Sequence, residues 1–352
     1  MTAAKCPTAI RTHVSRDYEI GDILATQKLI GGMFLEPCRL STTLGSYVLR
    51  AHQFRQTDET FKFQAETLQL LHDAGHRCPR VIKRRDGSWG ESDGNAFWAL
   101  HEYAAGHIYS WDEWWELKAD RQFLFDCGAA IAKLHDDLAA ISPSGDPSLL
   151  PSLPPIQFSH LHDIQVQWES DLDRFGQPGP SAHPHSQRAL MADRRELKDY
   201  WEILGSAVSE GRICDLPSQI VHGDISPVNA VFSGGDFTLI DWDCSRYGFR
   251  LYDALGDLLI RRPDGATNYA AFDPAEVLAY LDGYQHATKR PISVAELHAV
   301  PVFCLARQLE DLRQRVAVLS RIDAASDFTY ALQIGSRIQS MREISRLFGL
   351  CR

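Results

Sequence analysis

Residues 220–257 read IVHGDISPVNAVFSGGDFTLIDWDCSRYGFRLYDALGD, and this stretch indicates the fold and the chemistry of the chain more clearly than any other. Two short apolar runs, residues 230–232 and 237–240, flank a Ser-Gly-Gly-Asp tetrapeptide that is typical of a tight turn. We therefore expect the two runs to pair as a β-hairpin.

Polar residues stand at both outer ends of this hairpin. Asn229 precedes the first strand and Asp241 follows the second. Because the strands of a hairpin run antiparallel, its two outer ends meet, and we expect these side chains to lie close together. An amide oxygen and a carboxylate suit Mg²⁺, which commonly takes one or two protein carboxylates together with the phosphates of a substrate. The sequence thus predicts a magnesium site at this end of the hairpin.

The composition of the chain argues against a nucleic-acid-binding protein, a zinc or disulfide-rich protein and a membrane protein. The 352 residues carry 36 Lys+Arg against 46 Asp+Glu, a net charge of −10, which argues against a nucleic-acid partner because such a partner requires a basic surface. The eight cysteines are scattered without a C-x-x-C pair, so we expect free thiols rather than a zinc site or a disulfide framework. The longest apolar run, residues 299–306, is too short to span a membrane, and no signal peptide is recognisable. We expect a cytoplasmic protein with no membrane association.

The distribution of strand and helix patterns predicts two lobes. Strand-like runs occupy residues 25–54, one helix follows and ends near Gly75, and two more strands are expected before residue 104. Beyond this point the apolar residues recur at helical spacing. Residues 142–185 are rich in proline, which interrupts long helices, and we interpret them as an insertion with a short helix near residues 163–174.

The sequence resembles the aminoglycoside phosphotransferase and choline kinase-like superfamily, whose members have a protein-kinase-like fold. The resemblance depends on H-G-D-x-x-x-x-N at residues 222–229, I-D-W-D at 240–243 and Y-D-A-L at 252–255. It implies an α+β, bilobal fold with a small antiparallel-sheet N-terminal lobe (residues 1–103), a hinge near 99–105, and a larger helical C-terminal lobe (104–352) that contains the insertion.

The same resemblance implies roles for individual residues. Asp224 would accept the proton of an attacking hydroxyl, while Asn229 and Asp241 would hold Mg²⁺ against the phosphates of ATP. His222 and Asp253 would support the loop that carries Asp224. The residues expected to contact the nucleotide are Gly31, Gly32, Arg50, Glu66 and Glu102.

The charged residues Arg50 and Asp257 have further expected contacts. Arg50 stands where protein kinases carry a phosphate-binding lysine, and we expect it to pair with Glu66. Asp257 follows Asp253 by one helical turn, and it is a candidate to bind an ammonium group of the substrate.

The resemblance implies an ATP-dependent phosphotransferase that adds the γ-phosphate to a hydroxyl of a small molecule. Three alternatives remain open: an antibiotic-modifying enzyme of the aminoglycoside type, a metabolic kinase similar to N-acetylhexosamine, homoserine or choline kinases, and a non-catalytic nucleotide-binding pseudokinase. A protein kinase is disfavoured because D-F-G and A-P-E segments are missing. The acceptor, the choice between ATP and GTP, and the oligomeric state stay undetermined at this point.

Overall fold

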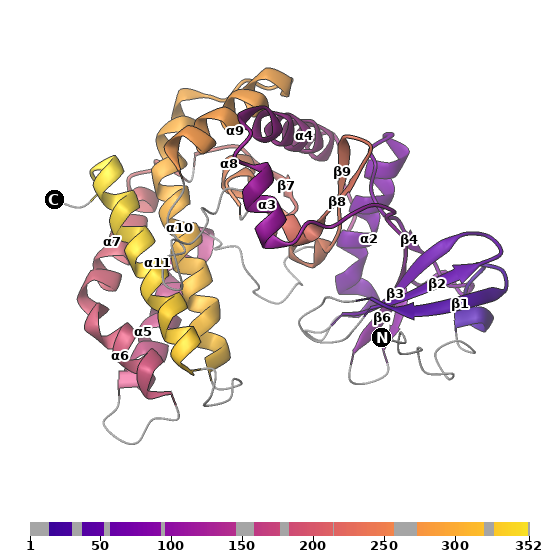
Figure 1. Ribbon diagram of the computed structural model, residues 1–352, viewed down its shortest axis with the longest axis horizontal. Helices are drawn as coiled ribbons and strands as arrows, with labels where there is room; N and C mark the ends of the chain where they lie inside the picture. Colours follow the sequence, from indigo (N-terminus) through magenta and orange to yellow (C-terminus); the bar gives the residue numbers. More distant parts are fainter. Residues whose placement is uncertain are drawn as a thin grey trace. The chain divides into compact units, whose positions relative to one another are not determined.

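The computed structural model describes residues 14–29, 37–52, 57–92, 96–145, 158–176, 183–213, 215–256, 273–319 and 327–350. Its internal contacts divide the chain into two compact units (Figure 1). Unit 1 comprises the described residues within Met1–Tyr109, Asp137–Leu153 and Val228–Arg246, and unit 2 comprises those within Ser110–Asp136, Pro154–Pro227 and Tyr247–Arg352. The units therefore alternate along the sequence, whereas the predicted lobes are contiguous, and a lobe boundary near residue 103 stays a prediction.

Unit 1 contains an antiparallel sheet in the order β1-β2-β3-β6-β4, with β5 also paired to β6. Its strands are β1 (Ile23–Lys28), β2 (Cys38–Thr42), β3 (Ser46–His52), β4 (Val81–Ile82), β5 (Gly90–Ser92) and β6 (Phe97–Glu102). One face buries Leu40, Leu49 and Leu100 in a common core. Because side chains alternate along a strand, Val48, Arg50 and His52 of β3 lie on the opposite face.

Helix α2 (Asp58–Asp73) is the helix expected within unit 1. Thr57 caps its first turn by accepting a hydrogen bond from the backbone N–H of Thr60, and the chain leaves the helix through Gly75, whose φ of 86° suits glycine. The helix buries Phe61, Phe63 and Leu68.

The predicted hairpin is confirmed to within one residue at each strand end. Strands β8 (Ala230–Ser233) and β9 (Asp236–Leu239) pair antiparallel, with Ala230 opposite Leu239. The connecting residues, Gly234 and Gly235, have φ values of 64° and 92°, the left-handed conformation that a two-residue hairpin turn requires.

Unit 2 is mainly helical. Its helices are α3 (Trp111–Leu117), most of α4 (Arg121–Ala139), α5 (Leu161–Gly176), α6 (Pro184–Ala192), α7 (Arg194–Ser209), α8 (Arg250–Ala254), α9 (Pro274–Ala287), α10 (Val294–Val318) and α11 (Asp327–Phe348), and strand β7 (Ser218–Val221) pairs with β10 (Arg246–Phe249). Helices α3, α9 and α10 are capped by Ser110, Asp273 and Ser293, because each side chain accepts a hydrogen bond from the first turn. Helix α5 contains the short helix predicted in the insertion. The α+β class is therefore confirmed.

One expectation about the cysteines is wrong. Cys78, Cys127, Cys244 and Cys304 are free, but Cys38 is disulfide-bonded. Sequence spacing alone does not reveal this bond, because pairing depends on which thiols the fold brings together. None of the helices in the described ranges is both long and apolar enough to cross a bilayer.

Candidate active site

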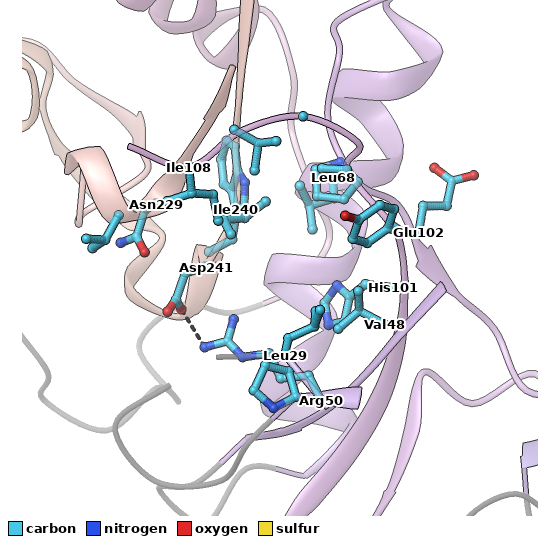
Figure 2. A pocket seen from close by; sticks show the side chains of 18 of the residues that line it. Leu29, Val48, Arg50, Leu68, His101, Glu102, Ile108, Asn229, Ile240 and Asp241 are labelled. Carbon is cyan, nitrogen blue, oxygen red and sulfur yellow. Dashed lines mark hydrogen bonds and ion pairs between the residues drawn. The ribbon is translucent and has the colours of Figure 1, made fainter. Parts of the chain in front are cut away.

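Unit 1 contains a cavity of about 280 Å³, close to the lower end of the range for small-molecule sites (Figure 2). Leu29, which follows β1, Val48 of β3 and Ile240, which follows β9, contribute apolar side chains to its wall. Leu68 comes from α2, so three parts of the sequence that are distant from one another build this pocket.

The hairpin brings Asn229 and Asp241 to the same pocket. The backbone N–H of Ile240 donates to the carbonyl of Asn229 at 2.8 Å, which fixes the two outer ends of the hairpin beside each other. Both side chains line the cavity, and Figure 2 shows the Asp241 carboxylate directed toward Arg50. The juxtaposition expected from the hairpin is present, and the metal-binding role remains a prediction.

The backbone at Asp241 is unusual. Its φ of 65° makes it the sole non-glycine residue with positive φ within the described ranges. Aspartate enters this left-handed region more readily than most residues, yet the conformation still costs on the order of 1 kcal/mol. Such local strain is concentrated at functional sites, where it directs a side chain that a regular strand would place elsewhere.

Arg50 bridges two carboxylates in the pocket wall. Its Nη2 lies 2.6 Å from Oδ1 of Asp241 and 3.0 Å from Oδ2 of Asp243. Burial by itself lowers the pKa of Arg50, but the charges of Asp243 and Asp241 outweigh burial and raise it. Burial would likewise raise the pKa of Asp243, whereas Arg50 and His52 hold it well below its usual value. The site therefore keeps a fixed positive charge beside the candidate metal ligands.

The predicted pairing of Arg50 with Glu66 is wrong. Glu66 accepts hydrogen bonds from the backbone N–H of Ser144 at 2.6 Å, from its hydroxyl at 2.9 Å and from the backbone N–H of Gly145 at 3.1 Å. The reason is the helical period: α2 turns Gln64 toward the pocket, and a residue two positions later points about 200° away. Glu66 thus ties α2 to the segment that follows α4.

Glu102 does line the pocket, at the end of β6. Its carboxylate accepts from Nε of Arg80 at 3.1 Å and from the backbone N–H of Arg80 at 3.2 Å. Burial would raise the pKa of Glu102, but the hydrogen bonds from Arg80 lower it. The neighbouring Tyr103 N–H donates to the carbonyl of Ser46, which fixes this strand end to β3.

Asp224 belongs to unit 2, where it follows β7 and is half-buried. Its backbone N–H donates to Nδ1 of the buried His222 at 3.2 Å. Asp253 accepts from the backbone N–H of His222 at 2.9 Å and from that of Gly223 at 2.8 Å. These contacts are the ones expected of residues that hold the Asp224 loop in place.

His135, on α4, is a buried partner of Asp253 that the sequence reasoning missed. Its Nε2 lies 3.1 Å from Oδ2 of Asp253, and its Nδ1 lies 2.8 Å from the hydroxyl of Tyr284. The available signal was that His135 follows Leu134 in a segment whose apolar residues recur at helical spacing, because a polar side chain within a buried helix face requires a partner.

Three predicted site residues lie outside the described residues. They are Gly31, Gly32 and Asp257. Their suggested contacts with nucleotide and substrate stay predictions.

The profile of the phosphotransferase enzyme family matches residues 37–300, which include the pocket hairpin, Asp224 and Asp253. The chain belongs to the phosphotransferase enzyme family. This family membership confirms the resemblance inferred from the sequence, and the protein is a small-molecule kinase, a phosphotransferase with an alcohol group as acceptor.

The phosphotransferase is similar in sequence to homoserine kinases. It is 23% identical over 342 residues to that of Rhodopseudomonas palustris (strain BisB18), covering 93% of this chain and 92% of the relative. It is 26% identical over 309 residues to that of Chelativorans sp. (strain BNC1), covering 86% and 82%.

Solved structures share the fold of the phosphotransferase. An amicoumacin kinase in complex with AMP-PNP, Ca²⁺ and Ami matches with a TM-score of 0.63 at 15% identity, covering 94% of this chain and 92% of that one. A microcompartment-associated aminopropanol kinase matches with a TM-score of 0.63 at 18% identity, covering 98% and 99%. The protein-kinase-like fold expected from the resemblance is confirmed.

Proposed function

We propose that this phosphotransferase transfers the γ-phosphate of ATP, with Mg²⁺, to a hydroxyl of a small molecule, and that Asp224 acts as the base. The observation that carries the proposal is the position of Asn229 and Asp241, which line one pocket from the two ends of one hairpin. That pocket also holds the fixed charge of Arg50.

The donor atoms at the end of the hairpin fit the metal. Asn229 offers an amide oxygen and Asp241 a carboxylate that is about one third exposed, so it is accessible from the pocket. Mg²⁺ prefers hard oxygen ligands and keeps positions for water and phosphate. When bound there, Mg²⁺ would neutralise charge on the β- and γ-phosphates.

The remaining groups perform positioning and proton transfer. Arg50 supplies a permanent positive charge toward the phosphates, and Asp224 accepts the proton of the attacking hydroxyl. A base of this kind contributes about 10²- to 10⁴-fold, whereas alignment of the reactants can contribute about 7–11 kcal/mol. We therefore expect positioning and electrostatics to provide most of the rate acceleration.

For the acceptor we propose a small amino alcohol or hydroxy amino acid of the homoserine type. Sequence similarity to homoserine kinases over 93% of the chain supports this class. Fold similarity to spectinomycin phosphotransferase, at a TM-score of 0.61 and 13% identity, favours an antibiotic of the aminoglycoside class as the second candidate.

A panel of acceptors tests the proposal. Purified wild-type protein and the Asp224→Asn variant are incubated with Mg·ATP and L-homoserine, aminopropanol, choline, an N-acetylhexosamine or an aminoglycoside, and ATP consumption is measured. The variant controls for contaminating kinases, and phosphorus NMR locates the new phosphate ester. We expect consumption with an amino alcohol or hydroxy amino acid. Nucleotide binding without consumption above the variant on any acceptor would instead identify a pseudokinase.

A further inference from the structure

Arg50 engages the carboxylate to which we assign the metal. Its Nη2 lies 2.6 Å from Oδ1 of Asp241, the contact that the dashed line in Figure 2 marks. Among the residues that the structure describes, Arg50 is the one hydrogen-bond or ion-pair partner of the Asp241 carboxylate. The group that the proposed function reserves for Mg²⁺ is therefore neutralised by a side chain of the protein.

The two carboxylates that Arg50 bridges hold it unequally. The contact to Asp243 is longer, at 3.0 Å, but the Asp243 side chain is only 13% exposed, and its other oxygen lies 2.9 Å from Nδ1 of His52. The Asp241 side chain is 34% exposed, and ion pairs weaken as water reaches them. Arg50 can therefore release Asp241 while Asp243 keeps the guanidinium in the pocket wall.

The guanidinium has donors left for a second partner. Both contacts to the carboxylates use Nη2, whereas Nε and Nη1 make no hydrogen bond to a described residue. Arg50 lines the cavity, and its side chain is 23% exposed. A guanidinium stays protonated and binds phosphate oxygens through paired N–H groups. Phosphates that enter the pocket would therefore compete with Asp241 for Arg50.

A divalent cation and Arg50 compete for the Asp241 carboxylate. A cation bound to this group would stand beside the guanidinium, and like charges repel more strongly in a partly buried site than in water. Binding through the second oxygen, Oδ2, leaves both cations on one carboxylate and does not remove the repulsion. The affinity of Asp241 for a metal should therefore rise when Arg50 moves to another anion.

We propose that Arg50 is a latch on the metal site: in the empty enzyme its guanidinium holds Asp241 against a free divalent cation, and the phosphates of the nucleotide release Asp241 by binding Arg50. The metal then enters together with the nucleotide rather than alone. This inference rests on the proposed function, since it uses the metal role of Asp241, and it adds an order of binding.

Titration of the nucleotide-free protein with Mn²⁺, followed by electron paramagnetic resonance of the free ion, tests the latch. Mn²⁺ is a suitable probe because it takes the same oxygen ligands as Mg²⁺. We expect Arg50→Gln to bind Mn²⁺ about fivefold or more tightly than the wild type, because a competing charge is removed. Arg50→Lys should gain about twofold or more: it retains the charge, but its side chain is shorter and its nitrogen falls short of the position of Nη2.

Arg39→Gln is the matched control for the loss of a charge. Arg39 lies opposite Val48 on the face of the sheet that also carries Arg50, but it donates to Ser46 at 3.3 Å rather than to Asp241. This variant should bind Mn²⁺ within about 1.5-fold of the wild type, because it leaves the latch in place.

Two further measurements separate the latch from general damage to the pocket. In EDTA, Arg50→Gln should bind a metal-free, non-hydrolysable ATP analogue about threefold or more weakly, because the phosphates lose their cationic partner. A distorted pocket would weaken both ligands, whereas the latch predicts opposite changes for metal and nucleotide. The double variant Arg50→Gln/Asp241→Asn should lose the gain in Mn²⁺ affinity, which assigns that gain to Asp241 rather than to Asp243.

The outcomes keep the latch and the proposed function apart. A smaller gain in Mn²⁺ affinity than expected for Arg50→Gln or Arg50→Lys overturns the latch, as does an equal gain in Arg39→Gln, a gain that survives in the double variant, or unchanged affinity for the metal-free analogue. If Arg50→Gln does not fold, Arg50→Lys decides. The proposed metal role itself is refuted if the wild type and Asp241→Asn bind the Mn²⁺ complex of the analogue equally.

Discussion

Replacing Asp253 by asparagine removes one charge from the buried support of the Asp224 loop while keeping the shape of the side chain. In the wild type, Oδ1 accepts from the backbone N–H of Gly223, and Oδ2 accepts from the backbone N–H of His222 and from His135. The carboxylate is 3% exposed, so water does not replace a lost partner.

The number of donors sets the expected loss of stability. In its best orientation the asparagine oxygen keeps His222 and His135, and its amide N–H₂ then faces the N–H of Gly223. The hydrogen bond from Gly223 to a charged acceptor is lost, which costs about 1.5–3 kcal/mol. The hydrogen bonds from His222 and His135 then have a neutral acceptor instead of a charged one, which costs about 0.5–1 kcal/mol each. We expect the free energy of unfolding to fall by about 2.5–5 kcal/mol. A displaced Asp224 should also reduce turnover about tenfold or more.

Urea unfolding at pH 7 measures the stability change, and Asp273→Asn serves as the matched control in the same unit. Asp273 caps α9 at a half-buried position where asparagine is an equally good cap, so this variant should lose less than about 1 kcal/mol. A free energy of unfolding for Asp253→Asn within about 1 kcal/mol of the wild type would refute the reasoning that the loop depends on this carboxylate.

The same carboxylate makes the stability pH-dependent. Burial alone would raise the pKa of Asp253, but the hydrogen bond and charge of His135 outweigh burial and lower it below its value in the unfolded chain. A lowered folded-state pKa gives stability that is present above the unfolded value, about 3.9, and is lost as the pH falls through the folded value. The stability gap between wild type and Asp253→Asn should therefore be constant near neutrality and shrink below about pH 4.

Three further variants test the assigned roles. Asp224→Asn should lower phosphoryl transfer by about 10²- to 10⁴-fold with Mg·ATP affinity within about twofold of the wild type, and unchanged turnover would remove Asp224 as the base. Asp241→Ala should weaken nucleotide binding about tenfold or more in the presence of Mg²⁺ and much less in its absence, as measured by calorimetry; equal affinities with and without the metal would contradict the metal assignment. Glu66→Gln should lower the free energy of unfolding by about 1–2 kcal/mol through its bonds to Ser144 and Gly145, with nucleotide affinity unchanged. A tenfold loss of ATP affinity in that variant would restore the nucleotide contact predicted from the sequence.

Features that depend on neighbouring residues could be predicted from the sequence. The turn at Gly234 and Gly235 specifies the hairpin because both positions require positive φ, and that hairpin in turn specifies that Asn229 meets Asp241. The helix starts at Ser110 and Ser293 were predictable for the same reason, since each cap and its glutamate are three residues apart.

Contacts between distant segments were the part that could not be predicted. Arg50 and Asp243 are 193 positions apart, and a charge on a strand does not show which of several carboxylates it meets. The choice between Gln64 and Glu66 depends on the rotation of α2 about its own axis, and a rotation of about 200° separates the two positions. The resemblance to the family therefore indicated Glu66, the charged residue of α2, whereas the fold turns the amide of Gln64 toward the pocket.

The two acids of I-D-W-D illustrate how backbone geometry separates residues that the sequence presents as equivalent. The left-handed turn at Asp241 and the short 3₁₀ segment Trp242–Cys244 direct the two carboxylates differently. Trp242 anchors this turn, because its buried indole N–H donates to the carbonyl of Leu239 at 3.0 Å. Asp243, 13% exposed, is engaged by both Arg50 and His52, whereas Asp241 is 34% exposed and lines the pocket. The carboxylate that a metal can reach is therefore Asp241, and Asp243 serves to hold Arg50 and the histidine pair in place.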